Sequence, residues 1–372
     1  MQNIKNKINN LLEEDPYNLS KSIKERKIIE ILKLQINHHK KNCSYYNTWY
    51  TKNNFLDPQK IKKYEDVPYL PSGIFKKINL KSTKLSNKII SSSGSSGQNK
   101  SIINIDNITS NFQKKSLGKI LNNTLNKKRR PFFIVDLEPS ENFNQNIISA
   151  RYAGMSGYLI AATSKNYLLK LDENNRIIID FKKIIELKKI IKKEPIILIG
   201  YTYMFWSYLL KNNQINLNKI SCHNDTKIIH FGGWKKLENK KVTKKIFINK
   251  IQNIMNIDSK SILDIYGFSE QLGTIYISRG LGGCNVSSYS HILIRDPKTL
   301  GIAKDGDAGF MQFLSITPLS YPGFSILNDD IGYISSRKIV KNVEKIEFKI
   351  NSRLDKLEAR GCGDTLPNNY YI

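Results

Sequence analysis

The sequence predicts an α/β protein built around a mostly parallel sheet. Apolar runs of four to six residues, each flanked by proline or glycine, recur along the chain, and such runs are typical of strands buried on both faces. Longer stretches with a helical rhythm separate them, as expected for βαβ units. The 372 residues are enough to bury a large core in one domain or in two closely joined ones.

Residues 1–65 predict an N-terminal helical segment. Apolar residues between Ile28 and Ile36 recur with a mostly helical rhythm. The aromatic segment 42–57 predicts a helix that packs on the main core. Pro68 and Pro71 then restrict the backbone, so residues 66–71 predict a fixed turn.

From residue 75 onward, we expect strands that alternate with helices. The expected strands lie at residues 88–90, 131–136, 157–161, 195–200 and 227–232. The stretches 181–193 and 244–256 predict the helices that connect parallel strands. Residues 285–350 have a more strand-rich pattern and predict a smaller β-rich part.

The composition gives a formal net charge of +27. Of the 59 basic residues only 10 are Arg, whereas proteins that read nucleic acids rely on Arg for bidentate contacts. The excess of Lys, Asn and Ile favours compositional drift toward AT-rich codons, and we expect no specific nucleic-acid partner. The basic clusters at 127–130 and 235–245 predict solvated faces, although a weak attraction to acidic partners stays open.

The spacing of the cysteines and the length of the apolar runs bear on the cellular compartment of the protein. The four cysteines show no CxxC spacing, which argues against a zinc site or a disulfide framework and favours the reducing cytoplasm. No apolar run reaches the ~18–20 residues of a transmembrane helix. The N-terminus lacks the apolar region of a secretory signal.

The most informative motif is the serine- and glycine-rich tract from Ser91 to Lys100. Such a tract alone is usually a flexible linker, but this one follows an apolar run and ends in lysine. Backbone N–H groups, hydroxyls and an ammonium group together suit a phosphate. The spacing of a Walker A loop is absent.

Three further motifs follow the tract, and each is weak by itself. Tyr266 and Gly267 precede Glu270, a carboxylate that suits Mg²⁺ bridging phosphates, although a strand-end turn with a capping Glu explains it equally well. Asp330 precedes Ile331-Gly332 and suits ribose hydroxyls. Arg353 and Asp355 complete the series.

The order of these motifs resembles that of the acyl-adenylate-forming superfamily. That superfamily carries a Ser/Thr/Gly loop ending in Pro-Lys, then YGxTE, TGDxG and a GRxD hinge. Here Asn99 replaces the proline, Ser269 the threonine of the second motif, and Asn328-Asp329 the Thr-Gly of the third. Gly232 and Gly233 lie where the superfamily has a glycine-rich strand end at its adenine pocket.

Within the superfamily, the chain is most similar to the acyl-protein synthetase (LuxE-like) family and more distantly to phenylacetate-CoA ligases. The closer match is carried by residues 67–71, 231–235, 266–271 and 361–364. The resemblance implies an adenylate-forming core at 66–335 with mostly parallel sheets flanked by helices and a smaller β-rich subdomain. It also implies a truncated hinge and tail at 336–372, with the C-terminal lid domain absent or vestigial, because only 11 residues follow Gly361.

The resemblance also implies a reaction: ATP and Mg²⁺ activate a carboxylic acid as acyl-adenylate, and a cysteine thiol then accepts the acyl group. Glu270 would bind Mg²⁺, Asp330 the ribose, and Arg353 the ribose or the α-phosphate. Tyr266, with its neighbour Gly267, would bracket adenine together with the two glycines of the 231–235 match. The phosphates would lie in the loop, at Ser92, Ser93, Gly94, Ser95, Ser96, Gly97 and Lys100.

Cys362 is the candidate acyl acceptor, because the family's acylated cysteine lies near the C-terminus. Its flanking glycines allow close approach, and Arg360 favours a thiolate, although a lone cysteine is more often inert. We expect a partner protein, either an acyl acceptor or a reductase, and an oligomer or complex. An acyl-CoA ligase and a catalytically silent binding subunit remain alternatives, and the acid stays open, with fatty acids included.

Overall fold

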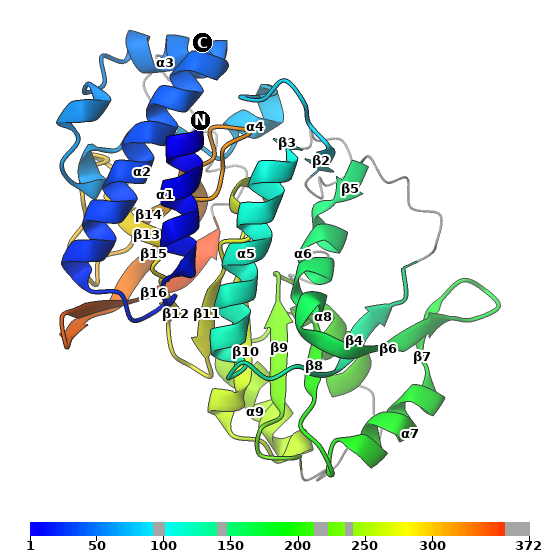
Figure 1. Cartoon of the computed structure of the whole chain (residues 1–372). Coiled ribbons are helices and arrows are strands. Elements are labelled where there is room, and N and C mark those ends of the chain that lie inside the picture. The colour runs from blue at the N-terminus through cyan, green and yellow to red at the C-terminus, as the bar shows by residue number, and fades with distance from the viewer. Residues whose placement is uncertain (92–100, 140–146, 212–221, 235–240, 354–372) are drawn as a thin grey trace.

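The computed structural model describes residues 1–91, 101–139, 147–211, 222–234 and 241–353 (Figure 1). The helices are α1 (Gln2–Glu13), α2 (Lys21–Asn42), α3 (Ser44–Lys52), α4 (Ile74–Lys77), α5 (Asn107–Thr124), α6 (Ala150–Tyr158), α7 (Phe181–Ile190), α8 (Thr202–Met204) and α9 (Lys244–Met255). A π-helical turn over Phe205–Leu210 continues α8.

The described strands fall into a large sheet and a small one. They are β1 (Leu70–Pro71), β2 (Lys88–Ser91), β3 (Ile102–Ile105), β4 (Arg130–Leu137), β5 (Ile147–Ser149), β6 (Ala162–Leu171), β7 (Ile177–Ile179), β8 (Ile197–Tyr201), β9 (Lys227–Phe231), β10 (Ile262–Tyr266), β11 (Tyr276–Arg279), β12 (Cys284–Asn285), β13 (Ser290–Arg295), β14 (Gly309–Ser315), β15 (Ser325–Val340) and β16 (Val343–Arg353).

The centre of the large sheet is parallel. Strands β10, β9, β8, β4 and β6 pair side by side in this order, each parallel to the next. On the β10 side the sheet continues through antiparallel strands β11, β12, β16, β15, β14 and β13. This arrangement confirms the predicted α/β class with a mostly parallel centre and a β-rich part.

Local sequence fixes the starts of the connecting helices. The side chain of Asp106 accepts a hydrogen bond from Thr109 N at 2.7 Å and caps α5. Asp180 caps α7, and Thr243 caps α9, in the same way. Such caps satisfy N–H groups that have no partner within the helix. The predicted helices at 181–193 and 244–256 are therefore confirmed, with the bounds given above.

Two hydrophobic clusters form most of the core of the described ranges, and a third, small one consists of Tyr69, Phe310 and Leu327. The larger includes the parallel strands, the N-terminal helices and α5, and Tyr46, Trp49 and Tyr50 of α3 contribute to it, as expected for the aromatic segment. The second cluster belongs to the antiparallel part, around Tyr276, Phe313 and Phe348. In Figure 1 the blue helices α1–α3 lie beside strands β13–β16, and α5 and α6 cover the parallel strands on the side toward the viewer.

Two sequence predictions are wrong. The run 157–161 is no strand: α6 ends at Tyr158, a 3₁₀ turn covers Leu159–Ala161, and β6 begins only at Ala162. Arg130, which was expected on a solvated face, is 2% exposed. It starts β4, and its guanidinium donates to the carbonyl oxygen of Asp225. No helix in the described ranges is long and apolar enough to cross a membrane.

Candidate active site

Glycines follow the parallel strands at their carboxyl ends, the edge where ligands bind in open α/β sheets. Phe231 at the end of β9 pairs with Ile265 of β10, so Gly232 and Gly233 lie next to Tyr266 and Gly267. Gly232 has φ +72°, and a Cβ there would lie 3.0 Å from the ring of Tyr201. Both conditions favour glycine and leave the backbone of this edge open to a ligand.

A hydrogen-bonded cluster joins the second and third motifs. The hydroxyl of Tyr266 donates to Asp330 Oδ2 at 2.6 Å, and the amide of Asn328 donates to the Tyr266 oxygen at 2.8 Å. Asn328 is buried, so its amide is fixed at this place. Across β15 and β16, Asp330 pairs with Arg353. The structure therefore brings Tyr266, Asp330 and the backbone of Arg353 together.

Glu270 lies in a 3₁₀ turn directly after β10 and is 7% exposed. Ser269 Oγ donates to its carboxylate at 3.0 Å, and Tyr321 donates to its backbone oxygen at 2.9 Å. Burial raises the pKa of the Glu270 carboxyl, while Ser269 and Ser101 act in the opposite direction. The neighbouring Gln271 is anchored to the carbonyl oxygens of Phe313 and Gly323.

In the sequence, the serine tract lies between two strands that pair with each other. Strands β2 and β3 are antiparallel, and Ser91 pairs with Ile102. Ser101 is 1% exposed and lies close enough to Glu270 to act to lower the pKa of its carboxyl. The residue that immediately follows the tract thus lies against Glu270. The tract itself, with Ser92, Ser93, Gly94, Ser95, Ser96, Gly97 and Lys100, lies outside the described residues, as does Cys362.

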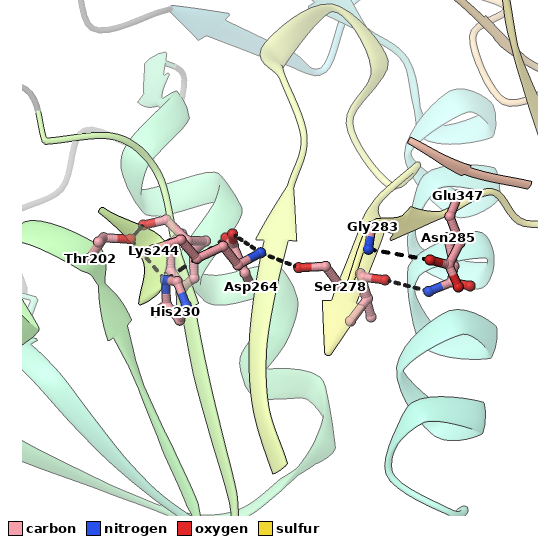
Figure 2. Close-up of polar contacts among 10 residues, drawn as sticks. Thr202, His230, Lys244, Asp264, Ser278, Gly283, Asn285 and Glu347 are labelled. Carbon is pink, nitrogen blue, oxygen red and sulfur yellow. Dashed lines mark hydrogen bonds and ion pairs between the residues drawn. The ribbon is translucent and has the colours of Figure 1, made fainter. Parts of the chain in front are cut away.

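A second polar cluster lies beneath this edge (Figure 2). His230 Nδ1 is 3.0 Å from Thr202 Oγ1 and 3.8 Å from Asp264 Oδ1. Lys244 of α9 forms an ion pair with Asp264 at 3.0 Å and donates to Ser278 Oγ at 2.7 Å. Burial lowers the pKa of His230. The cluster holds α9 against β9, β10 and β11.

Sequence reasoning missed several of these residues. Asn328 stood out only as a departure from the motif, although it is the residue that hydrogen-bonds Tyr266. Ser101 directly follows Lys100, the last residue of the serine- and glycine-rich motif. Asp264 precedes Tyr266 by two positions on one strand, so the alternation of a strand places both on the same face. The apolar segment from Tyr201 to Trp206 is largely buried in the main core.

Comparisons with known proteins agree with this arrangement. A long-chain-fatty-acid–luciferin-component ligase of Vibrio harveyi is 26% identical over 311 residues, which cover 81% of this chain and 78% of that protein. The open conformation of 2-hydroxyisobutyryl-CoA ligase, solved with 2-HIB-AMP and CoA, superposes with a TM-score of 0.67 at 10% identity. That match covers 91% of this chain and 77% of the other.

The same ligase in its thioesterification state gives a TM-score of 0.63 at 11% identity, covering 91% of this chain and 70% of the other. These structural likenesses show the adenylate-forming fold. The model of the family named "Acyl-protein synthetase, LuxE" matches residues 2–371, and this match favours an acyl-protein synthetase over an acyl-CoA ligase or a silent binding subunit. The chain belongs to the LuxE family of acyl-protein synthetases and is an ATP-dependent, AMP-forming ligase that joins an acid to a thiol.

Proposed function

We propose that the edge formed by Gly232, Tyr266, Glu270 and Asp330 is the adenylation site. The observation that carries this assignment is the proximity of Ser101 to Glu270. Ser101, the residue that follows the serine tract, therefore lies beside a buried carboxylate. The Tyr266–Asp330 hydrogen bond lies at the end of the same strand. Phosphate-binding and nucleoside-binding groups are therefore supplied to one place by segments far apart in the chain.

In the first half-reaction, a carboxylate oxygen of the acid attacks the α-phosphorus of ATP. The bond from this phosphorus to the bridging oxygen breaks, and its electron pair leaves with pyrophosphate. Such a displacement depends on positioning and on neutralisation of charge. Tyr266, with Gly232, Gly233 and Gly267, would bracket adenine, Asp330 would bind the ribose and Arg353 would assist it. The phosphates would lie in the loop from Ser92 to Gly97 together with Lys100.

The Glu270 carboxylate suits a divalent cation. It is buried and accepts a hydrogen bond from the hydroxyl of Ser269, and Ser101 lies close enough to act on its pKa. Within the described ranges it forms no ion pair, so its negative charge is available to a metal ion. Glu270 would hold Mg²⁺ there, and the ion would supply positive charge that offsets the charge of the phosphates.

In the second half-reaction, the thiolate of Cys362 attacks the acyl carbonyl carbon of the adenylate. The bond from that carbon to the AMP oxygen breaks, and AMP leaves with the electron pair. Thiolates are effective nucleophiles toward such mixed anhydrides. We propose a fatty acid as the acid, since the Vibrio relative is named for a long-chain fatty acid.

The acyl group would pass from Cys362 to an acyl-accepting or reductase partner protein, in an oligomer or complex. The described cysteines, at positions 43, 222 and 284, are free thiols. Free thiols persist in reducing compartments, so we place the enzyme in the cytoplasm.

Acid-dependent exchange of pyrophosphate into ATP tests the first half-reaction. A panel of acids of increasing chain length is offered, and the preferred acid is used for the variants. Glu270→Ala and Lys100→Ala should each abolish exchange. Glu173→Ala, which removes an exposed carboxylate after β6, is the matched control and should retain it. Full exchange in Glu270→Ala would contradict the assigned role of that carboxylate.

Labelling with a radioactive acid tests the second half-reaction. Cys362→Ser should exchange pyrophosphate at the rate of the unchanged chain but lose the hydroxylamine-labile acyl-enzyme. Cys222→Ser, which replaces a half-buried thiol, should keep both activities. Persistence of the labile adduct in Cys362→Ser would remove Cys362 from the mechanism.

A further inference from the structure

The short helix α4 is held against the candidate active site by its backbone. Pro71 of β1 pairs in parallel with Leu327, the residue before Asn328. Ser72 N then donates to the carbonyl oxygen of Leu327 at 2.9 Å. The chain turns into α4 at Gly73, so this helix starts beside the strand that carries Asn328 and Asp330.

Side chains connect α4 to Glu270. Phe75 is 1% exposed and meets the ring of Tyr321 edge-on, with the ring centroids 6.1 Å apart. The hydroxyl of Tyr321 in turn donates to the backbone oxygen of Glu270. Phe75 therefore fixes α4 with respect to the turn that carries the carboxylate.

The other end of α4 lies against the strand that follows the serine tract. Asn79, two residues after the helix, accepts a hydrogen bond from the amide of Asn104 on β3. Strand β3 begins at Ile102, directly after Ser101. α4 therefore lies between the strand that follows Ser101, the turn that contains Glu270 and the strand that contains Asp330.

Two adjacent lysines end α4, and the structure distinguishes them. Lys76 and Lys77 are both exposed, and Lys76 forms no ion pair with any described residue. Burial raises the pKa of Glu270, and the positive charge of Lys76 is among the effects that oppose this rise. The charge of Lys76 is therefore felt at the carboxylate.

A buried carboxylate beside phosphates requires positive charge. Four negative charges of a triphosphate would meet the carboxylate of Glu270, and charge grows on the bridging oxygen as pyrophosphate departs. An ammonium group on a flexible stem can follow this charge as a point donor.

We propose that the ammonium group of Lys76 contacts the phosphates of ATP and stabilises the charge that develops on the departing pyrophosphate. This inference rests on the proposed function, because it concerns the first half-reaction of the same site. It assigns the end of the segment that follows the predicted turn at residues 66–71 to the catalytic apparatus.

The test compares Lys76→Gln with Lys77→Gln in the full chain. Removal of one charge-stabilising donor typically costs ~10²–10³-fold in rate, so Lys76→Gln should lower acid-dependent exchange by about 10²-fold. Lys77→Gln should stay within about twofold of the unchanged chain, and Lys76→Arg should recover part of the lost rate. Thermal unfolding of each variant shows that the fold is kept.

A second readout separates catalysis from general damage. Offered ready-made acyl-adenylate, Lys76→Gln should acylate Cys362 at the unchanged rate, because the pyrophosphate has already left. Unaltered exchange in Lys76→Gln, or equal losses in both lysine variants, would overturn the role of Lys76 while leaving the proposed function intact. Absence of exchange in the unchanged chain with every acid would overturn both.

Discussion

The hydroxyl of Tyr266 joins two motifs that lie 64 residues apart in the chain. It donates to the carboxylate of Asp330 and accepts from the amide of Asn328. A hydrogen bond to a charged group contributes about 1.5–3 kcal/mol, and a buried amide left without its partner costs free energy as well. One oxygen atom therefore sets the position of the carboxylate that is proposed to bind ribose.

Tyr266→Phe keeps the ring and removes this oxygen. We expect the KM for ATP to rise by about 10-fold, the equivalent of ~1.4 kcal/mol, with a smaller loss in the free energy of unfolding. Exchange kinetics at varied ATP and urea denaturation measure the two effects. Tyr333→Phe, on the same strand as Asp330, is the control, and an equal rise in KM there would refute the specific role of Tyr266.

At the scale of single residues, the sequence identifies candidate functional side chains but not the contacts between them. Tyr266, Glu270 and Asp330 could be selected because each residue type suits a nucleotide and because their order matches a family. The role of Asn328 could not be predicted, since an amide in place of threonine gains meaning only when its partner is known. Lys76 likewise stands among 49 lysines, and only the fold sets it apart.

Helix α9 and strands β9, β10 and β11 are joined by a chain of polar contacts through Asp264 (Figure 2). Burial alone would raise the pKa of Asp264, but His230 and Lys244 outweigh this effect and lower it. Lys244 in turn acts to lower the pKa of His230, in the same direction as burial. Burial and the ammonium group at the start of α9 thus both act to lower the pKa of the imidazole, and the ammonium group also acts to lower the pKa of the carboxyl.

Lys244→Met retains most of the side-chain stem and removes the charge. The pKa of His230 should rise, because a positive neighbour is lost while Asp264 remains. Titration of the imidazole resonances by NMR measures the shift, with Lys245→Met on the same helix as control. A pKa of His230 that stays constant or falls in Lys244→Met would contradict this account of the cluster.

Strands were predictable where their apolar runs are bounded on both sides. β4, β8 and β9 lie where the sequence placed them. The prediction of a strand at residues 157–161 failed because a short apolar run also fits the buried end of a helix. Gly157 sits against α5 so closely that a Cβ would lie 2.8 Å from Leu117 Cδ2. This helix-to-helix contact, which no local pattern reveals, decides the conformation.

At the scale of the whole molecule, hydrogen bonds join segments that are far apart in the chain. Ser288 N donates to the carbonyl oxygen of Pro16 at 2.6 Å. The hydroxyl of Tyr289 donates to the carbonyl oxygen of Glu14, and Lys21 N donates to the carbonyl oxygen of Asn342. The helices α1 and α2 are therefore fastened to the β-rich part. The sequence predicted helices and a β-rich part but not this contact, because pairing between remote segments has no local signature. The division at residues 65 and 335 stays a prediction.

Two buried histidines should make the whole fold sensitive to mild acid. The ring of His39 stacks on Phe324 with centroids 5.4 Å apart, and that of His291 on Tyr64 at 3.8 Å. Burial holds the pKa of each well below 6.5; His38 adds to the effect at His39, and Lys24, Arg337 and Lys21 add to it at His291. Below pH 6.5 the unfolded chain therefore binds protons that the folded chain does not.

The free energy of unfolding should consequently fall as the pH drops from 7 to 5, by up to ~1.4 kcal/mol per pH unit for each histidine. His230, whose pKa burial also lowers, adds to this slope, whereas Glu270 acts in the opposite direction because its pKa is raised in the fold. Urea denaturation at pH 7, 6 and 5 measures it. His39→Phe and His291→Phe should each flatten the slope whatever their effect at pH 7, whereas Tyr64→Phe, which alters a ring partner but removes no group titrating in this range, should leave it unchanged. A slope equally steep in both histidine variants would assign the acid sensitivity to other groups.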